Sequence, residues 1–258
     1  NTYLKLDGTP FTSTPGYETM LFKDEVKNRD LRLAQTIRSG DYKRISNGVQ
    51  VPAPPLFSYT YTGYQPIKWA LDDMYYDTRD LNINSIPLIR YAEVLLNYAE
   101  AKYELSEANQ LVIDQTINKL RDRVGMPHLI IGNEPADSRL DGIYQTHVGA
   151  SIHPLLREIR RERRIEMAFE NTRWDDLMRW KAGKLINVPV EGIKFVQSQF
   201  PTVVTNKDIY LSAEGYILPY FKTIPAGRKF DETKGYLFPI PTEDLILNKN
   251  LVQNPNWK

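Results

Sequence analysis

The stretch that decides much of the fold is IRRERRIEMAFENTRWDDLMRWK, residues 159–181. Its apolar residues recur at helical spacing, and Ser151 upstream can cap a long helix that runs to about Glu170. A second helix is predicted to start after Thr172 and to end at Gly183, because glycine commonly follows the last turn of a helix. The stretch therefore predicts two helices in close succession.

A row of glutamates marks the first of these helices, because Glu158, Glu162, Glu166 and Glu170 lie four residues apart. On a helix this spacing places them on one face, where like charges disfavour each other by roughly a few tenths of a kcal/mol. The row favours structural ion pairs with arginines from other segments, although a solvated face or a ligand site would also fit. The candidate partners are Arg90, Arg121, Arg123, Arg173 and Arg179.

Residues 86–124 predict a helical hairpin. The segment PLIRYAEVLLNYAEA, residues 87–101, carries two apolar rows at helical spacing. A second helix is predicted over residues 114–124, and Gly125 and Pro127 supply its end. Small alanines at positions where helices approach closely are typical of one tetratricopeptide-type unit. Because one such unit cannot bury both of its faces, we expect neighbouring helices.

Glycine and proline punctuate the remaining sequence, which predicts loops. One short helix is expected within residues 23–37. The segment FSYTYTGY, residues 57–64, alternates large rings with small residues and predicts an extended strand with Phe57, Tyr59 and Tyr61 on one face. We expect a single domain over residues 1–258, with a looped region (1–86), a helical core (87–183) and an irregular C-terminal region (184–258). The predicted fold class is mainly α, with tetratricopeptide-like helical pairs and a loop-rich, short-stranded region.

Composition excludes several classes of function. The 33 Lys+Arg and 32 Asp+Glu residues give a formal net charge of +1, so no long-range field attracts nucleic acid or an anionic membrane. No apolar run approaches the roughly 18 residues that a membrane span needs. The absence of cysteine excludes disulfides, thiolate metal sites and iron–sulfur clusters, and the three histidines match no zinc motif. With no calcium-loop motif either, we predict no metal and no cofactor.

Six segments of the sequence, taken in order, form a pattern of motifs. NRDLRL (28–33), PLIRYAEVLLNYAEA (87–101), LRDRVGMP (120–127), the stretch 159–181, FPIPTEDL (238–245) and NPNW (254–257) follow one another along the chain. Their order and spacing resemble the C-terminal half of SusD/RagB-family proteins and cover nearly the whole sequence. Leu31 departs from the family pattern, which usually has proline at that place.

The resemblance implies a SusD-like α-α superhelix whose looped region binds a nutrient, usually a glycan or oligosaccharide. It implies a surface lipoprotein of the outer membrane of Bacteroidota that serves a SusC-like TonB-dependent transporter and is not an enzyme. The family's lipid-bearing cysteine and first helical pairs would lie upstream of Asn1. We therefore expect a fragment, attached to the membrane only through a lipid anchor outside this chain.

Aromatic residues supply the candidate binding site. The 16 Tyr, 9 Phe and 4 Trp residues amount to 11% of the chain, and sugar binding needs exposed rings with a few polar groups nearby. Because rings on alternating strand positions are usually buried, a role in the core or in a transporter contact is the competing interpretation. A second, weaker cluster is Tyr210, Tyr216, Tyr220 and Phe221. The predicted ligand-binding residues are Tyr59, Tyr61, Tyr64, Trp69, Asp72, Tyr75 and Tyr76.

Two other classes of protein remain as alternatives. A non-catalytic helical-repeat scaffold would present a bare concave helical face to a protein partner, whereas roughly half of this chain is predicted as loops. A glycoside hydrolase would use paired carboxylates, for which the dipeptides Asp72-Asp73 and Asp175-Asp176 are available. Such a pair must come from separate elements across a cleft, so adjacent residues give no specific support. We predict no catalytic residue.

Overall fold

The computed structural model describes residues 1–257, apart from the side chain of Arg79. The chain divides into two compact units. The first comprises Asn1–Asp137, His153–Asn171 and Val190–Pro219, and the second comprises Ser138–Ile152, Thr172–Pro189 and the chain from Tyr220 onward. Within residues 1–257, none of the helices has both the length and the apolar character that crossing a bilayer requires.

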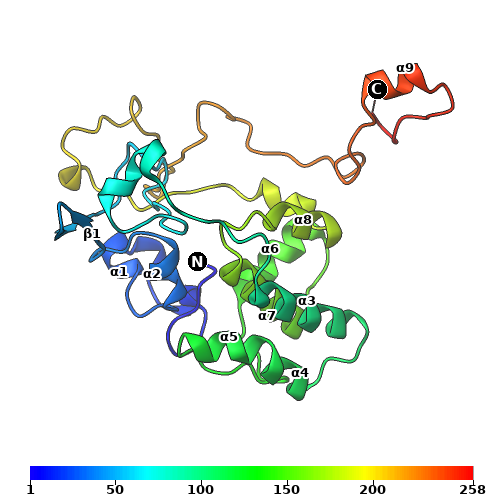
Figure 1. Ribbon diagram of the computed structural model, residues 1–258, viewed down its shortest axis with the longest axis horizontal. Coiled ribbons are helices and arrows are strands. Elements are labelled where there is room, and N and C mark those ends of the chain that lie inside the picture. Colours follow the sequence, from blue (N-terminus) through cyan, green and yellow to red (C-terminus); the bar gives the residue numbers. More distant parts are fainter. Residues whose placement is uncertain (258) are drawn as a thin grey trace. The chain divides into compact units, whose positions relative to one another are not determined.

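Four helices form the main core of the first unit: α3 (Tyr91–Glu104), α4 (Gln110–Gln115), α5 (Ile117–Arg123) and α7 (Pro154–Glu166). Helix α3 packs along α7 and also contacts α4 and α5 (Figure 1). Its inner face buries Leu96 and Ala99 against Ile113, Ile117 and Ile159. Full burial of each large aliphatic side chain contributes about 1.5–3 kcal/mol, so this contact holds the helices together.

The helices differ in detail from the sequence-based predictions. The second helix of the hairpin is split at Thr116, where φ is −124° and ψ is −89°. Helix α7 starts at Pro154, because the Nδ1 atom of His153, and not Ser151, accepts a hydrogen bond from the first turn, the Leu155 N–H at 3.3 Å. It ends at Glu166 rather than near Glu170, since Phe169 has a φ of 60° and leaves the helical region.

The outer face of α3 is exposed. Tyr91, Val94, Tyr98 and Leu105 follow one another at spacings of three, four and seven residues and all reach solvent. The inner face is buried, as described above. In the described part of the chain, the hairpin thus buries one of its two apolar faces, and the neighbouring helices expected for the other face remain a prediction.

Short elements make up the loop-rich part of the first unit. A hairpin pairs β1 (Lys43–Ser46) with β2 (Val49–Pro52) in antiparallel register. Its turn residues Asn47 and Gly48 have φ angles of 50° and 77°, as a tight two-residue hairpin turn requires. Two short helices replace the one predicted within residues 23–37, and 3₁₀ turns complete the region. These elements are α1 (Phe22–Glu25), α2 (Arg32–Thr36), η1 (Phe11–Ser13), η2 (Tyr17–Thr19), η3 (Met74–Asp77), η4 (Arg79–Leu81) and η6 (Gln197–Gln199).

The strand predicted over residues 57–64 is wrong, because this segment forms turns and bends. The Thr60 hydroxyl accepts a hydrogen bond from the Thr62 N–H at 3.3 Å, and the Thr62 hydroxyl accepts one from the Tyr64 N–H at 3.2 Å. Threonine side chains that bond to nearby backbone groups compete with a strand ladder. The alternation of rings and hydroxyls therefore marks a local turn structure and not a strand.

The second unit contains α6 (Ser138–Val148), α8 (Arg173–Arg179), η5 (Gly183–Asn187) and α9 (Thr242–Leu247). Its apolar core consists of Leu177, Trp180 and Ala182. Helix α8 starts directly after Thr172, as predicted, and ends at Arg179. The Phe230 ring lies 6.5 Å from that of Trp174, and the Tyr236 hydroxyl accepts the Gly183 N–H at 3.1 Å, so the segment after residue 220 packs on α8 and η5.

Candidate functional site

The candidate site is built around the β1–β2 hairpin of the first unit. Arg44 on β1 donates two hydrogen bonds to the carboxylate of Asp77, each at 2.7 Å, and a third to the Leu71 carbonyl at 2.7 Å. The Ile45 N–H donates to the Asp72 carbonyl at 3.0 Å. The hydrogen bonds from Arg44 lower the pKa of Asp77. Together these contacts hold residues 71–77 against the hairpin.

Two of the predicted tyrosines lie on this segment. The Asp73 carboxylate accepts the Tyr75 N–H at 2.9 Å and thereby starts the short helix η3. The rings of Tyr75 and Tyr76 meet edge to face, with centroids 5.3 Å apart. The backbone bonds of residues 71–77 thus fix where these two rings are presented.

Polar groups gather beside the hairpin. The Tyr42 hydroxyl donates to the Asp72 carboxylate at 2.8 Å, and burial together with this contact raises the pKa of Tyr42. The Arg38 guanidinium lies 5.7 Å from the Tyr42 ring centroid. Tyr42 is therefore the link between Arg38 and Asp72.

Arg38 is itself buried, and its Nη1 atom donates to the carbonyls of Ala53 and Pro54 at 3.4 and 3.1 Å. Its Nε atom is also buried and has no hydrogen-bond partner among the described residues. Burial lowers the pKa of Arg38, and the nearby Arg44 lowers it further. A buried donor without a protein partner is uncommon, and an ordered water can satisfy it.

Three of the predicted tyrosines are strongly exposed: Tyr59, Tyr61 and Tyr75 have relative accessibilities of 73%, 82% and 61%. An apolar ring of this size in solvent forgoes the stabilisation that burial would give it. Exposure is what an aromatic ligand platform requires. Burial in the core therefore does not apply to these three rings, whereas a contact with a transporter remains the competing interpretation.

Tyr64 and Trp69 lie in other surroundings. Tyr64 packs its ring edge against Phe22 at 5.7 Å and donates its hydroxyl to Glu25 at 2.7 Å. Burial and the Glu25 carboxylate both raise the pKa of Tyr64. The indole N–H of Trp69 donates to the Phe169 carbonyl at 3.0 Å. Both side chains therefore have structural contacts, and any contact with a ligand remains a prediction.

The second aromatic cluster is divided between the two units. Tyr216 in the first unit donates its hydroxyl to the Glu18 carbonyl, and the Lys194 ammonium lies 5.3 Å from its ring centroid. Tyr210 also belongs to the first unit, whereas Tyr220 and Phe221 belong to the second. Sequence proximity alone had grouped these four residues.

Three of the four carboxylates considered for a hydrolase are engaged in local structure. Asp72 accepts from Tyr42, and Asp73 accepts from the start of η3. In the second unit, the buried Asp176 accepts from Arg179 at 2.8 Å. Across residues 1–257, no cluster of three or more histidine, aspartate or glutamate side chains could hold a metal ion.

Sequence reasoning missed Arg38, Tyr42 and Arg44, which connect the predicted residues to one another. Asn47-Gly48 carried the available signal, since this dipeptide between two short extended runs is typical of a hairpin. Recognition of the hairpin would have drawn attention to the side chains on and beside its first strand.

The family of this chain follows from its sequence as a whole. Residues 1–257 match the model of the SusD family. The chain belongs to the SusD family. SusD-like protein P2 of Formosa agariphila is 29% identical over 176 residues, which are 68% of this chain and 26% of that protein. The resemblance to SusD/RagB proteins is thereby confirmed.

Solved structures of SusD-like proteins are also similar to this chain. A SusD-like protein from Bacteroides fragilis matches with a TM-score of 0.64 and 24% identity, over 99% of this chain and 45% of its own. A SusD-like carbohydrate binding protein from the same species matches with a TM-score of 0.64 and 28% identity, over 97% of this chain and 46% of its own. The chain thus spans less than half the length of these relatives. The mainly helical SusD-like fold class is confirmed, and the expectation that the chain is not an enzyme agrees with this family of non-catalytic binding proteins.

Proposed function

We propose that this chain belongs to a surface protein that binds a glycan or oligosaccharide and delivers it to a SusC-like TonB-dependent transporter. The observation that carries the proposal is the exposure of Tyr59, Tyr61 and Tyr75 in the hairpin region of the first unit, which is the β1–β2 hairpin and the chain that follows it to residue 77. Membership of the SusD family supports it, as does the similarity to a solved carbohydrate binding protein.

The chemistry of this region suits a sugar. A pyranose ring has an apolar face that stacks on tyrosine, and its equatorial hydroxyls pair with planar polar groups. The Asp72 carboxylate is exposed beside the Tyr42 hydroxyl and offers an acceptor for the hydroxyls of a stacked sugar. In this proposal the exposed tyrosines bind the ring faces, and the carboxylate orients the ligand.

The proposed location is the outer surface of the outer membrane. The support is the family alone, whose members are surface lipoproteins. Stable co-purification with an outer-membrane transporter tests the partner separately from the ligand. Failure to co-purify would contradict delivery while leaving glycan binding untouched.

Affinity gel electrophoresis against a panel of polysaccharides tests the ligand. We expect one polymer to retard the protein, and Tyr61→Ala or Tyr75→Ala to weaken the interaction by about tenfold each. Tyr91→Ala is the matched control, since Tyr91 is equally exposed but lies on α3, outside the hairpin region. Equal loss in all three variants would contradict a platform at the hairpin. Absence of retardation by any polymer would contradict glycan binding.

A further inference from the structure

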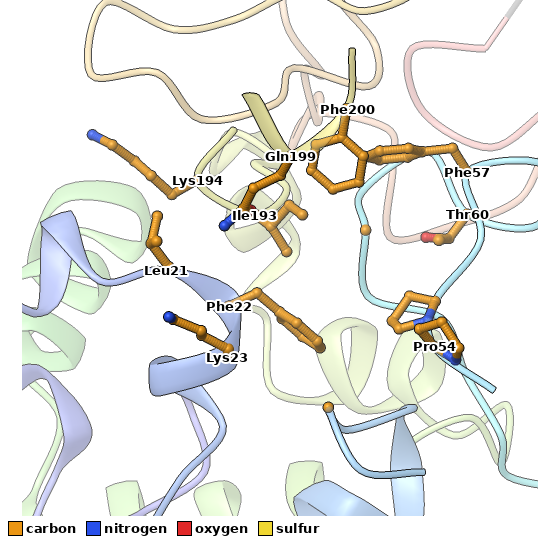
Figure 2. A pocket seen from close by; sticks show the side chains of 13 residues that line it. Leu21, Phe22, Lys23, Pro54, Phe57, Thr60, Ile193, Lys194, Gln199 and Phe200 are labelled. Carbon is orange, nitrogen blue, oxygen red and sulfur yellow. The ribbon is translucent and has the colours of Figure 1, made fainter. Parts of the chain in front are cut away.

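A pocket of about 210 Å³ lies in the first unit, and the loop that carries Tyr59 and Tyr61 contributes Phe57, Thr60 and Gly63 to its lining. Four separate segments form it: the start of α1, the turn at Gly40, the loop of residues 54–63 and residues 193–200 around η6. Figure 2 shows the Phe22, Phe57 and Phe200 side chains around the space, with Ile193 and Pro54 between them.

The walls of the pocket are aromatic and well supported. The Phe57 and Phe200 rings meet at 5.0 Å edge to face, and Phe200 stacks on Phe195 at 5.4 Å. Phe195 and Ile193 belong to the buried core behind the pocket. Ring pairs of this geometry are stabilised beyond their burial alone, so the walls resist collapse into the space.

A close approach of backbone also shapes the pocket. Gly63 has a φ of 84°, and a Cβ atom at this position would lie 2.7 Å from the Ile193 side chain. The loop therefore passes directly over Ile193, which only glycine allows. This contact keeps the loop of residues 54–63 at a defined distance from the core beneath it.

Polar groups that line the pocket are mostly engaged elsewhere. The Thr60 hydroxyl bonds to the Tyr64 carbonyl at 3.1 Å, and the Lys194 ammonium bonds to the Glu214 carbonyl. Lys23 is exposed. Among the described residues that line the pocket, none carries a carboxylate. A sugar placed here would leave most of its hydroxyls without partners, which costs about 1–3 kcal/mol for each one.

The volume limits the ligand further. Sites for drug-sized ligands are roughly 300–1,000 Å³, so this pocket is too small for an oligosaccharide. An apolar cavity of about 150 Å³ is known to take one benzene ring. The 210 Å³ found here leaves room for one aromatic ring with a small substituent.

We propose that this pocket is a second binding site, which takes a single neutral aromatic ring such as the phenolic ring of an aryl glycoside or aryl ester. It goes beyond the proposed function, in which exposed tyrosines bind sugar rings. The two sites use different residues, so either can be disproved without the other.

The test is a ligand-observed NMR titration of the whole chain with 4-methylphenol, and with methyl β-glucoside as the non-aromatic comparison. We expect saturable binding of 4-methylphenol, no competition by the glucoside, and a loss of about tenfold or more in Leu21→Trp, whose indole would fill the pocket. Leu105→Trp is the matched control, because Leu105 is exposed at the end of α3 and far from the pocket lining.

Gln199→Phe, at an exposed lining residue, gives a second blocking variant if Leu21→Trp does not fold. Unchanged binding in a folded blocking variant would overturn the proposal, as would competition by the glucoside or the absence of saturable binding to the folded protein. Tyr61→Ala should leave 4-methylphenol binding unchanged, and it thereby separates this site from the glycan site.

Discussion

Two regions of the first unit depart from the rule that charged side chains face solvent and large rings are buried. Helix α7 buries charged groups, and Glu162 there has a relative accessibility of 0%, whereas the loop around Tyr61 leaves that ring 82% exposed. Glu162 accepts hydrogen bonds from Arg32 at 2.5 Å and from Arg121 at 3.0 Å. A buried charge is tolerated when partners satisfy it, and an apolar ring stays in solvent when local bonds direct its backbone outward.

The buried charges form a network rather than isolated pairs. Glu166 accepts from Arg32 at 3.0 Å, from Arg90 at 2.6 Å and from Arg123 at 2.9 Å. Each arginine comes from a different segment, so the network connects α2, the start of α3 and α5 to α7. The exposed tyrosines have no such network, which leaves them available to a ligand.

We expect the largest effect from a change to the buried charges of α7. Glu162→Gln removes the charge that Arg32 and Arg121 share, and we expect the free energy of unfolding to fall by about 3–5 kcal/mol. Chemical denaturation measures it. Glu107→Gln is the control, because Glu107 forms an exposed pair with Lys102 worth at most about 1 kcal/mol. Equal losses in both variants would show that the network contributes no more than a surface pair.

Acid should weaken the same network. Burial alone would raise the pKa of Glu162 above the usual 4.5, but Arg32 and Arg121 lower it below that value. Because the folded pKa is the lower one, the stabilisation is complete above pH 4.5 and is lost as the pH falls through the folded pKa. Thermal unfolding between about pH 7 and pH 3 should show a falling midpoint below pH 4.5, with a shallower fall in Glu162→Gln. Identical pH profiles would disprove the role of Glu162.

We expect the smallest effect on stability when the hydroxyl is removed from either of two tyrosines in one loop, Tyr64 and Tyr61. Tyr64→Phe removes the hydroxyl that donates to Glu25, and we expect it to cost about 1 kcal/mol of stability. Tyr61→Phe removes an exposed hydroxyl and should change stability by less than about 0.5 kcal/mol. Urea unfolding of both variants measures the difference. A larger cost for Tyr61→Phe would mean that its ring supports the fold instead of a ligand.

Prediction from sequence succeeded where the signal is local or nearly so. The periodicity of residues 87–101 predicted α3, and the helix predicted from Ser151 to about Glu170 contains α7, which is shorter at both ends. The row of glutamates predicted ion pairs with Arg90, Arg121 and Arg123. Lys68 and Arg32 were missed as partners because they come from the looped region, which has no period to place them. Arg179 instead pairs with Asp176 in the second unit.

By itself the sequence determined the family, the mainly helical fold class and the helical segments, because residue order and helical period are properties of neighbouring residues. Only the tertiary structure decided which rings reach solvent, since Tyr61 and Tyr64 lie three residues apart in the same loop yet differ in burial. It also decided which arginines meet Glu162, because Arg32 lies 130 residues away in the chain. Such contacts depend on the packing of distant segments, for which residue type and spacing carry no direct signal.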